Sequence, residues 1–394
     1  MIDFTTAGES HGPGLVAIVS GIPAGLALTA ADVDGDLARR QKGYGRGGRM
    51  RIETDRIRFL SGVRGGKTLG SPISFLIQNK DWENWKDAMD PEAEPTGPKA
   101  RHVSAPRPGH ADLAGFLKYG HRDLRNVLER ASARETAARV AVGAICRTLL
   151  RGFGIDVASE VLTIAGEGLP RGSWAKRDPV KRRDAIEKSD VRCADVKASA
   201  AMKAAIQAAQ HARDTVGGIF LTVAEGAPPG LGTYASWDGR LDTRLAAAFM
   251  SIPAIKGVEV GLGFECAARR GSKVHDPIRA KKGGGFQRLS NNAGGLEGGT
   301  TNGERIEVTA AMKPISTLSR PLESVNLKTG EKAEAAVERS DTCAVPAAAV
   351  VGEAMMSIVL ARAFREKFGG DSVEEIESSF RGYTKLVARR GKLR

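Results

Sequence analysis

The sequence predicts a fold of mixed α and β structure in which buried helices pack against sheets. Two helical stretches, one near the middle of the chain and one near its end, are apolar on most faces, which is typical of helices surrounded by other elements. Several shorter stretches are apolar runs or alternate apolar with polar residues, as strands do. Hydrophobic residues make up 41% of the 394 residues and charged residues 27%, as in globular proteins.

Strands are expected where these runs end at glycine, proline or polar turns. Residues 15–19 (LVAIV) follow a polar turn and are continuously apolar, so a buried strand is expected there. Residues 51–54 and 56–60 alternate charged with apolar side chains, which predicts a hairpin. Further strands are expected over 71–78 and 217–224.

Four helices are expected. The first starts at Thr29, whose side chain can cap the helix with Asp32 three residues on, and ends at Arg40. The last begins beside Pro346, because proline suits the first turn of a helix. The predicted helices span 29–40, 124–153, 195–211 and 346–368.

Three segments are expected to lie outside the core. Residues 79–100 and 169–198 are rich in charged residues and contain prolines, which predicts surface insertions. Residues 268–304 are basic and rich in glycine and asparagine, and they lack periodicity, which predicts a functional or mobile loop.

The net charge of +13 indicates polyanionic partners, which include nucleic acids, membrane surfaces and small phosphorylated or carboxylated ligands. Aromatic residues are only 5%, so stacking surfaces for single-stranded nucleic acid are scarce. The most apolar stretch, residues 343–360, contains Pro346 and Glu353, so no membrane span is expected. The N-terminus carries no export signal, which predicts a cytoplasmic protein. The four cysteines lie far apart, so neither a metal site nor a disulfide scaffold is expected.

Two histidines occupy settings that suit chemistry. His11 follows Ser10 on a turn flanked by glycines, where a ligand can approach the backbone closely. His110 lies in the segment PRPGHAD, which two prolines make rigid. Imidazole titrates near neutral pH and suits general acid catalysis. For each histidine, the alternative of a hydrogen-bonded loop residue stays open.

Arginines gather in two places. Arg40, Arg46 and Arg49 lie in or beside a glycine-rich loop that can supply bidentate partners for phosphate or carboxylate. Arg130 and Arg134 lie one helical turn apart on a helix that then becomes apolar, which points to a charged ligand at the edge of the core. The alternative is a solvated basic surface or, for the loop, contact with RNA.

The last third of the chain adds backbone amides and polar side chains. Residues 291–299 (NNAGGLEGG) can expose a run of backbone N–H groups, and residues 313–317 (KPIST) add an ammonium group and hydroxyls, both of which suit a phosphate-bearing ligand. Asp341 precedes the last predicted helix, where it either caps the helix or accepts a proton at the edge of an apolar pocket. Residues 61–68 lack the first glycine of a P-loop, so a nucleotide hydrolase is disfavoured.

Eight segments together resemble the signatures of chorismate synthase in order and spacing. They are GESHGPGLVAIVSGIPAG, RRQKGYGRGGRM, PRPGHADL, LERASARETAARVAVGA, AIKGVEVGLGF, NNAGGLEGGTTNGE, MKPIST and RSDTCAVPAAAVVGEAM. The resemblance spans residues 8–365 and is far more specific than any single segment.

The resemblance implies both a fold and an activity. The fold is a single α+β domain, here residues 1–394, with helices sandwiched between antiparallel β-sheets and assembled as a homotetramer. The activity is the 1,4-elimination of phosphate from 5-enolpyruvylshikimate 3-phosphate, which gives chorismate in the last shared step of aromatic biosynthesis and requires reduced FMN. A substrate with two carboxylates and a phosphate needs many cations in its site.

The resemblance also implies roles for matching residues. His11 resembles the histidine beside the leaving phosphate, His110 the one that protonates or stabilises the reduced flavin, and Asp341 the carboxylate that works with flavin N5 in removing the C6 proton. The residues that resemble substrate ligands are Ser10, Arg40, Arg46, Arg49, Arg134 and Arg339. The residues that resemble FMN ligands, several of them from a neighbouring subunit, are Arg130, Ala131, Ser132, Pro253, Ala254, Gly298, Lys313, Pro314, Ile315, Ser316, Thr317 and Arg339. Arg40 and Arg46 also resemble residues that contact NADPH in some members.

Two positions depart from the family pattern. Pro253 stands where the family usually has Asn or Gln, so it lacks a side-chain amide and a backbone donor. Ala131 leaves Ser132 as the one hydroxyl where some members have two serines. Some members reduce FMN with NADPH themselves, and others depend on a separate flavin reductase. The length leaves no room for a reductase domain, which favours the second route.

Two other classes of function are compatible with parts of the sequence. A basic RNA- or DNA-binding protein would use the arginine- and glycine-rich loop, and its affinity would fall steeply with salt. A binding module that has lost catalysis would lack catalytic residues, whereas His11, His110 and Asp341 are all present. We expect neither nucleic acid nor a membrane as a partner.

Overall fold

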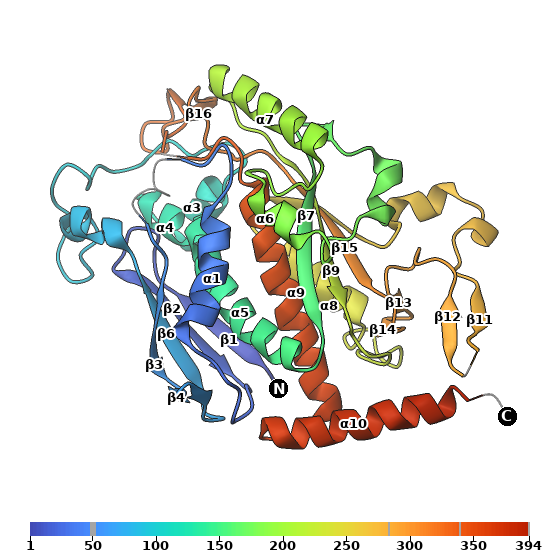
Figure 1. Ribbon diagram of the computed structural model, residues 1–394. Helices are drawn as coiled ribbons and strands as arrows, with labels where there is room; N and C mark the ends of the chain where they lie inside the picture. Colours follow the sequence, from blue (N-terminus) through green and yellow to red (C-terminus); the bar gives the residue numbers. More distant parts are fainter. Residues whose placement is uncertain (48–52, 283, 339, 393–394) are drawn as a thin grey trace.

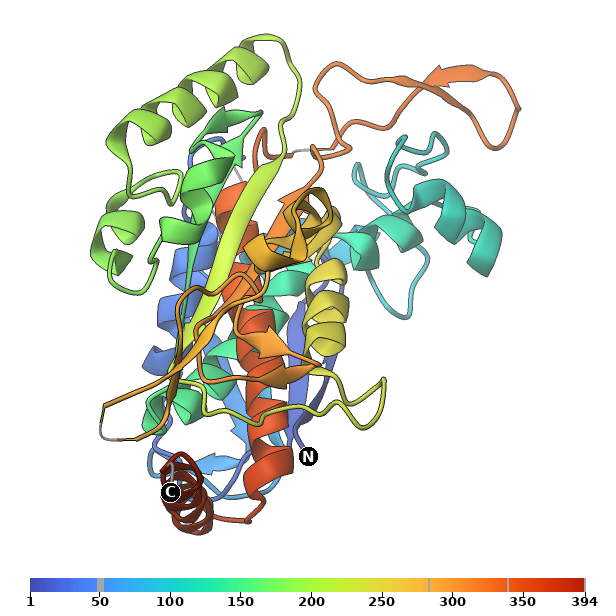
Figure 2. The same ribbon diagram turned by 90° about the vertical axis from the view of Figure 1, so that its right-hand side faces the viewer.

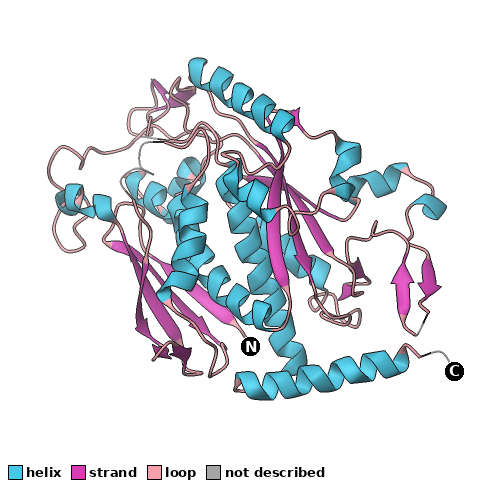
Figure 3. Cartoon of the chain, viewed as in Figure 1, coloured by secondary structure: helices cyan, strands magenta, loops and turns pink. Residues whose placement is uncertain are grey.

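Two antiparallel sheets lie on either side of a layer of helices (Figures 1 and 3). The computed structural model describes residues 1–47, 53–282, 284–338 and 340–392. The first sheet has the strand order β1-β2-β6-β3, with bounds β1 Asp3–Ala7, β2 Gly14–Ser20, β3 Ile57–Ser61 and β6 Ile73–Gln78. Alternate residues of β6, namely Ile73, Phe75 and Ile77, are fully buried, so one face of this sheet covers the core.

The second sheet has the strand order β10-β15-β9-β7-β8. Its strands are β7 Asp156–Ile164, β8 Glu167–Gly168, β9 Gly218–Glu225, β10 Ile255–Val260 and β15 Ile306–Met312. Short two-stranded ribbons join β4 Val63–Arg64 to β5 Lys67–Thr68, β11 Ile278–Ala280 to β12 Phe286–Arg288, β13 Leu296–Glu297 to β14 Thr300–Thr301, and β16 Glu323–Val325 to β17 Lys332–Glu334. Figure 2 shows the β16–β17 ribbon projecting from the body of the molecule.

Three helices fill the layer between the sheets: α1 Ala30–Gln41, α5 Thr136–Gly152 and α9 Val345–Phe368. Helix α5 contacts β2 of the first sheet and β7 of the second, and α9 contacts β7 and β9. A Cβ atom at Gly143 of α5 would lie 2.3 Å from the Cβ of Ala354 in α9. Glycine at this position is therefore what lets the two helices approach so closely.

The remaining helices lie around this layer. They are α3 Asp112–Tyr119, α4 Arg125–Ala131, α6 Arg183–Lys188, α7 Val196–His211, α8 Leu241–Met250 and α10 Val373–Arg390. Helix α10 crosses the far end of α9 (Figure 1), where the ring of Phe380 packs 5.5 Å from Phe364 and 5.3 Å from Phe368. These aromatic contacts close the core at that end.

Helix α9 is long and apolar enough to span a membrane by length and composition. Its most apolar window is 94% buried, however, because strands β7 and β9 of the second sheet and the neighbouring helices cover it. The hydropathy of this helix is therefore that of a core helix.

Most of the predicted elements are confirmed, as is the α+β architecture with helices between antiparallel sheets. Thr29 and Asp32 form a capping box at the start of α1, with Thr29 N donating to Asp32 Oδ2 at 2.7 Å. The predicted strands at 15–19, 71–78 and 217–224 correspond to β2, β6 and β9.

The helix predicted over 124–153 is broken, and that prediction is corrected. Helix α4 ends at Ala131 and α5 begins at Thr136. Between them, the side chain of Ser132 accepts a hydrogen bond from the backbone N–H of Arg134 at 3.2 Å. A serine that caps a new turn ends the preceding helix.

The hairpin predicted over 51–60 is also corrected. Residues 53–56 form no strand, and Ile57 of β3 pairs with Ile77 of β6; residues 51 and 52 lie outside the described residues. The alternation there arises because Glu53 and Asp55 are buried against arginines rather than because a strand has two faces.

The segments expected to lie at the surface do so only in part. In 79–100, Asp81 and Trp85 are buried, whereas most residues beyond 90 are exposed. Part of 169–198 turns into the core. Residues 268–304 carry the β11–β12 and β13–β14 ribbons.

Candidate active site

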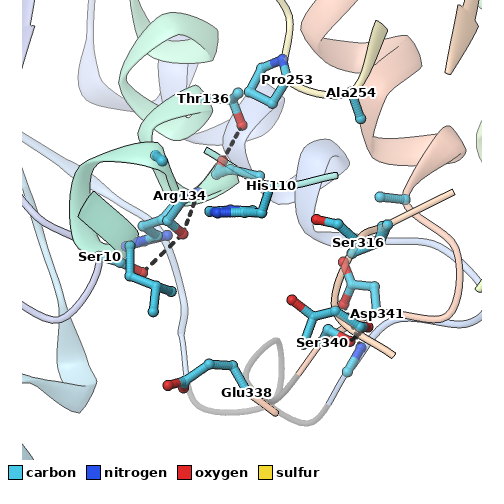
Figure 4. Close-up of a pocket in the computed structure, with 18 of the residues that line it drawn as sticks. Ser10, His110, Arg134, Thr136, Pro253, Ala254, Ser316, Glu338, Ser340 and Asp341 are labelled. Carbon is cyan, nitrogen blue, oxygen red and sulfur yellow. Dashed lines mark hydrogen bonds between the residues drawn. The ribbon is translucent and has the colours of Figure 1, made fainter. Parts of the chain in front are cut away.

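A cavity of about 450 Å³ opens where the end of α1 meets the first turns of α5 and α9 (Figure 4). This size is typical of small-molecule sites. Cationic side chains outnumber carboxylates in its lining. The lining comes from segments that are far apart in the chain, chiefly 10–11, 40–47, 107–111, 128–136, 252–254, 312–317 and 338–351.

The imidazole of His11 is held on its edge and on its face. Its Nδ1 lies 2.9 Å from Oε1 of Glu129, and its backbone N–H donates to Oε2 of the same carboxylate at 2.7 Å. Its ring stacks on Trp85 with centroids 4.1 Å apart. Burial raises the pKa of Glu129, but the hydrogen bonds and charge of His11 outweigh burial and hold that pKa below its usual value.

His110 has a similar partner. Its Nδ1 lies 2.5 Å from Oδ1 of Asp112, the first residue of α3. Arg107 donates from Nε to Asp112 Oδ2 at 2.8 Å and from Nη1 to Thr317 Oγ1 at 2.8 Å, which ties the histidine turn to the 313–317 segment. Burial raises the pKa of Asp112, but hydrogen bonds from His110 and Arg107 outweigh burial and lower it.

Asp341 lies across the cavity from Ser10 and Arg134 (Figure 4). Its Oδ1 accepts a hydrogen bond from the backbone N–H of Gly47 at 2.6 Å, and its Oδ2 lies 3.1 Å from Nη1 of Arg46. The N-cap residue of α9 is Ala344, so Asp341 does not cap this helix. The alternative of a structural cap is thereby excluded, and the carboxylate lines the cavity.

Two buried arginines share Asp55. Arg134 donates from Nη1 to both carboxylate oxygens of Asp55, at 2.6 and 2.7 Å, and from Nε to Asn79 Oδ1 at 2.9 Å. Arg40 donates from Nε to Thr136 Oγ1 at 3.0 Å, while its Nη1 lies 3.6 Å from Asp55 Oδ2. Both guanidinium groups are thus fixed before any ligand arrives.

Each of these guanidinium groups keeps one buried nitrogen that has no hydrogen-bond acceptor within the described ranges: Nη1 of Arg40 and Nη2 of Arg134. Burial, with the charges of Arg46 and Arg134, lowers the pKa of Arg40 to about 9, although Asp55 opposes this shift. An anionic oxygen would satisfy such donors. Nη2 of Arg134 lies 3.8 Å from Oε2 of Glu53. Because both arginines line the cavity, a phosphate or carboxylate bound there would add to their partners.

One wall of the cavity is apolar and suits a flat ring. It is formed by Ile252, Pro253, Ala254, Ala347, Ala348 and Val351. The backbone of Ala254 is left-handed, with φ of +69°, and its carbonyl accepts a hydrogen bond from Lys313 N at 2.9 Å. The 313–317 segment is thereby fixed beside this wall.

The structure brings most of the predicted site residues to this cavity. Those that line it are Ser10, His11, Arg40, Arg46, His110, Ala131, Ser132, Arg134, Pro253, Ala254, Lys313, Pro314, Ile315, Ser316, Thr317 and Asp341. Arg130 instead donates to the carbonyls of Thr6 and Gly8 at 2.9 and 3.2 Å, and Gly298 lies in the β13–β14 turn. Arg49 and Arg339 lie outside the described residues.

Residues at the site that were not identified from the sequence include Trp85, Arg107, Asp112 and Glu129. Asp112 follows His110 by two positions in a rigid turn, and that spacing is a usable signal. Glu129 meets His11 across 118 positions of sequence, and nothing local to either residue indicates the pairing.

The arrangement can handle protons on two sides of one ligand. Two imidazoles, each with Nδ1 against a buried carboxylate, lie among buried arginines, and the Asp341 carboxylate lies opposite Arg134. An anionic group held by the arginines can leave with help from an imidazole, while a carboxylate takes a proton elsewhere on the ligand. The described residues hold no group of three or more His, Cys, Asp or Glu side chains that could bind a metal ion.

Comparison with known proteins gives one consistent result. The family model of chorismate synthase matches residues 2–364. A chorismate synthase of Rubrobacter xylanophilus is 57% identical over 384 residues, covering 98% of this chain and 97% of that protein, and one of Desulforudis audaxviator is 56% identical over 391 residues, covering 98% of each. A crystal structure of chorismate synthase superposes with a TM-score of 0.79 at 43% identity, covering 98% of both chains.

Proposed function

The chain belongs to the chorismate synthase family, and on this premise we propose that it eliminates phosphate from 5-enolpyruvylshikimate 3-phosphate to form chorismate, with reduced FMN as cofactor. Members of this family are enzymes, lyases of aromatic biosynthesis. The observation that carries the proposal is the cavity in which two imidazoles, a carboxylate and buried arginines with unsatisfied donors face one another. A nucleic-acid-binding surface would need exposed cations, whereas the side chains of Arg40 and Arg134 are only 5% and 3% exposed.

The residues present fit a flavin and a phosphorylated substrate. The unsatisfied nitrogens of Arg40 and Arg134 call for anionic oxygens. The apolar wall at Pro253 and Ala254 suits an isoalloxazine ring, with the 313–317 segment beside it. FMN, when bound in reduced form, supplies an electron-rich ring that assists the departure of phosphate.

The chain's own residues then account for binding and proton transfer. Arg40 and Arg134 hold the phosphate and carboxylates in a site screened from water. As the C3–O bond breaks, His11 donates a proton to the leaving phosphate. Asp341, fixed by its hydrogen bond from Gly47, accepts the proton lost from C6, so that a new C=C bond forms without net oxidation. His110 would protonate or stabilise the reduced flavin.

The proposal extends to the assembly and to the supply of reduced flavin. We propose a homotetramer in which a neighbouring subunit contributes Arg130 and Gly298 to the flavin, and the position of both residues away from the cavity lining supports this. Reduced flavin would come from a separate reductase in the cytoplasm, with NADPH as the alternative direct reductant.

An anaerobic assay tests the proposal. Photoreduced FMN and 5-enolpyruvylshikimate 3-phosphate are expected to give equal amounts of chorismate and phosphate, and NADPH with oxidised FMN is expected to give none. Asp341→Asn should lower kcat at least about 100-fold, whereas Asp178→Asn, outside the cavity, should not. Turnover with NADPH alone would reject the separate reductase, and the absence of product in both assays would reject the proposed function.

A further inference from the structure

We propose that Glu129 is a positioning residue for His11: its carboxylate keeps a proton on Nδ1 and so makes Nε2 the nitrogen that delivers a proton to the ligand. The proposal rests on the proposed function only in taking His11 as the proton donor. Glu129 would not touch the substrate, and it would act entirely through the ring of His11.

The contact between these residues fixes both the ring and the backbone. One carboxylate accepts from the His11 backbone N–H at 2.7 Å and lies 2.9 and 3.1 Å from Nδ1 of the same residue. An ionised carboxylate can only accept hydrogen bonds, so this geometry requires a hydrogen on Nδ1. Glu129 thereby ties the orientation of the ring to the backbone of the same residue.

The face of the ring is held as well. The imidazole stacks on Trp85 at 4.1 Å with 26° between the planes. The indole is fixed in turn, because Trp85 Nε1 donates to Asp81 Oδ2 at 3.2 Å. A half-turn of the imidazole, which would exchange Nδ1 for carbon, would break the contact with Glu129 even though the stack could persist. Trp85 therefore sets the plane of the ring, and Glu129 sets which edge of the ring faces the carboxylate.

Glu129 is itself built into the structure. Its side chain is only 2% exposed, and Arg125 Nη1 lies 3.4 Å from its Oε1. Its backbone carbonyl accepts a hydrogen bond from Ser10 N at 3.0 Å, so α4 is bonded to the histidine turn by both backbone and side chain. The lowered pKa of Glu129 keeps it ionised at neutral pH.

The first test reads the proton directly and needs no substrate. Protein labelled with ¹⁵N-histidine is examined at pH 8 by two-bond ¹H–¹⁵N correlation, with His11 assigned from a His11→Asn variant. The wild type is expected to carry the His11 proton on Nδ1, and Glu129→Gln to lose this preference. Glu135→Gln is the matched control, because Glu135 is a carboxylate six positions further along the chain, beyond the end of α4, and is paired with Arg139 and Thr6 outside the cavity.

The second test separates positioning from a structural role. Glu129→Gln is expected to lower kcat on the order of 10–100-fold with KM changed by less than about twofold. Glu129→Asp should restore part of kcat, because it keeps a carboxylate that can only accept hydrogen bonds, whereas glutamine can also donate. Glu135→Gln should leave kcat unchanged. If Glu129→Gln does not fold, Glu129→Asp carries both tests, with a smaller loss of kcat expected and the Nδ1 proton retained.

An unchanged Nδ1 proton in Glu129→Gln, an unchanged kcat, or an equal loss of kcat in Glu135→Gln would each overturn the proposal. Its failure is distinguishable from failure of the proposed function. A wild type that forms no chorismate rejects the function, while the tautomer measurement still decides whether Glu129 holds His11.

Discussion

Arg39 and Arg40 are neighbours near the end of α1, both are largely buried, and their surroundings differ in kind. Arg39 faces the helix layer, where its guanidinium reaches carboxylate oxygens of Glu187 and Glu353 at 2.7 and 2.8 Å. Arg40 faces the cavity, where an oxygen of Asp55 lies 3.6 Å away and one guanidinium nitrogen keeps no hydrogen-bond acceptor within the described part of the chain.

The pKa values of the two arginines shift in opposite directions. Burial lowers the pKa of both groups. For Arg39 the charges and hydrogen bonds of Glu353 and Glu187 outweigh burial and raise the pKa above its usual value. For Arg40 burial dominates and lowers the pKa to about 9. The difference arises from partners, because both residues lie on the same helix.

Buried charge alone therefore does not mark a binding site. The helix-layer cluster has equal numbers of acidic and basic groups and consists of Asp36, Arg39, Arg147, Glu187, Arg192 and Glu353. Its carboxylates and guanidinium groups lie within 3.1 Å of one another, so it stabilises the packing of α1, α5 and α9, although Nε of Arg192 also lacks a hydrogen-bond acceptor in the described part of the chain. The cavity arginines differ in lining an open cavity, where a ligand can complete their partners.

The largest expected effect is the loss of stability when the helix-layer cluster is broken. Glu353 is 2% exposed and bonds Arg39, Arg147 and Arg192, so Glu353→Gln leaves three cations without this carboxylate. The free energy of unfolding, measured with urea, should fall by about 3–5 kcal/mol. The control Glu377→Gln removes a surface pair and should cost about 0.5 kcal/mol or less. Equal losses would contradict the contrast between the two regions.

The difference in stability between wild type and Glu353→Gln should depend on pH. The cations around Glu353 outweigh its burial and lower its pKa below the ordinary value of 4.5. Its contribution is therefore complete above the unfolded value and is lost as pH falls below it. The difference in unfolding free energy between wild type and Glu353→Gln should be constant from neutral pH to pH 5.5 and shrink below about 4.5.

An intermediate effect is expected on the cavity side. Inorganic phosphate at 100 times its dissociation constant should stabilise the wild type by about 2.7 kcal/mol. At the same phosphate concentration, Arg40→Met should retain less than half of this increment, because it removes an unsatisfied donor, and should change the unliganded stability by about 1 kcal/mol or less. Thermal unfolding with and without phosphate measures both quantities.

Arg39→Met is the matched control for that experiment. It removes one of the cationic partners of Glu353 and of Glu187, so it should destabilise the unliganded protein by about 3 kcal/mol and leave the phosphate increment unchanged. If the two methionine variants behave alike, the assignment of one arginine to structure and the other to a ligand is wrong.

The smallest effect concerns the apolar wall. Pro253→Asn supplies an amide where the wall has none, and one added hydrogen bond should lower the dissociation constant of reduced FMN about 2- to 10-fold. Anaerobic titration of FMN measures it, with Pro253→Ala as the control for loss of the ring. Tighter binding in both variants would indicate a steric effect of proline instead of a missing donor.

Local chemistry predicted much of the fold. The capping residues Thr29 and Asp32, the apolar run at 15–19 and the apolar helix beginning near Pro346 all depend on neighbours in sequence, and the structure has them as expected. Motif resemblance named most of the cavity-lining residues, because glycine-flanked and proline-flanked turns keep their local pattern. The resemblance did not show which of these residues contact one another.

Other contacts depended on distant partners that the local sequence does not show. The alternation at 51–54 and 56–60 suggested a hairpin, but Glu53 and Asp55 are buried because Arg134, about 80 positions away, lies beside them. Likewise the pairing of His11 with Glu129 depends on how the strands and helices pack. Such contacts are set by tertiary structure, so the periodicity of a local sequence does not predict them.

The position of α9 at the centre of the core has a consequence for synthesis of the chain. On the ribosome, the first sheet and α5 emerge long before residues 345–368. Their apolar faces, including the surface of α5 at Gly143 against which α9 packs, therefore stay uncovered until that helix has been translated. The cavity cannot exist on a nascent chain that ends before Asp341 and the first turn of this helix. Docking of α9, once residues 345–368 have left the ribosome, is therefore the step at which both the core and the site form, and the apolar faces exposed until then are where chaperones would bind.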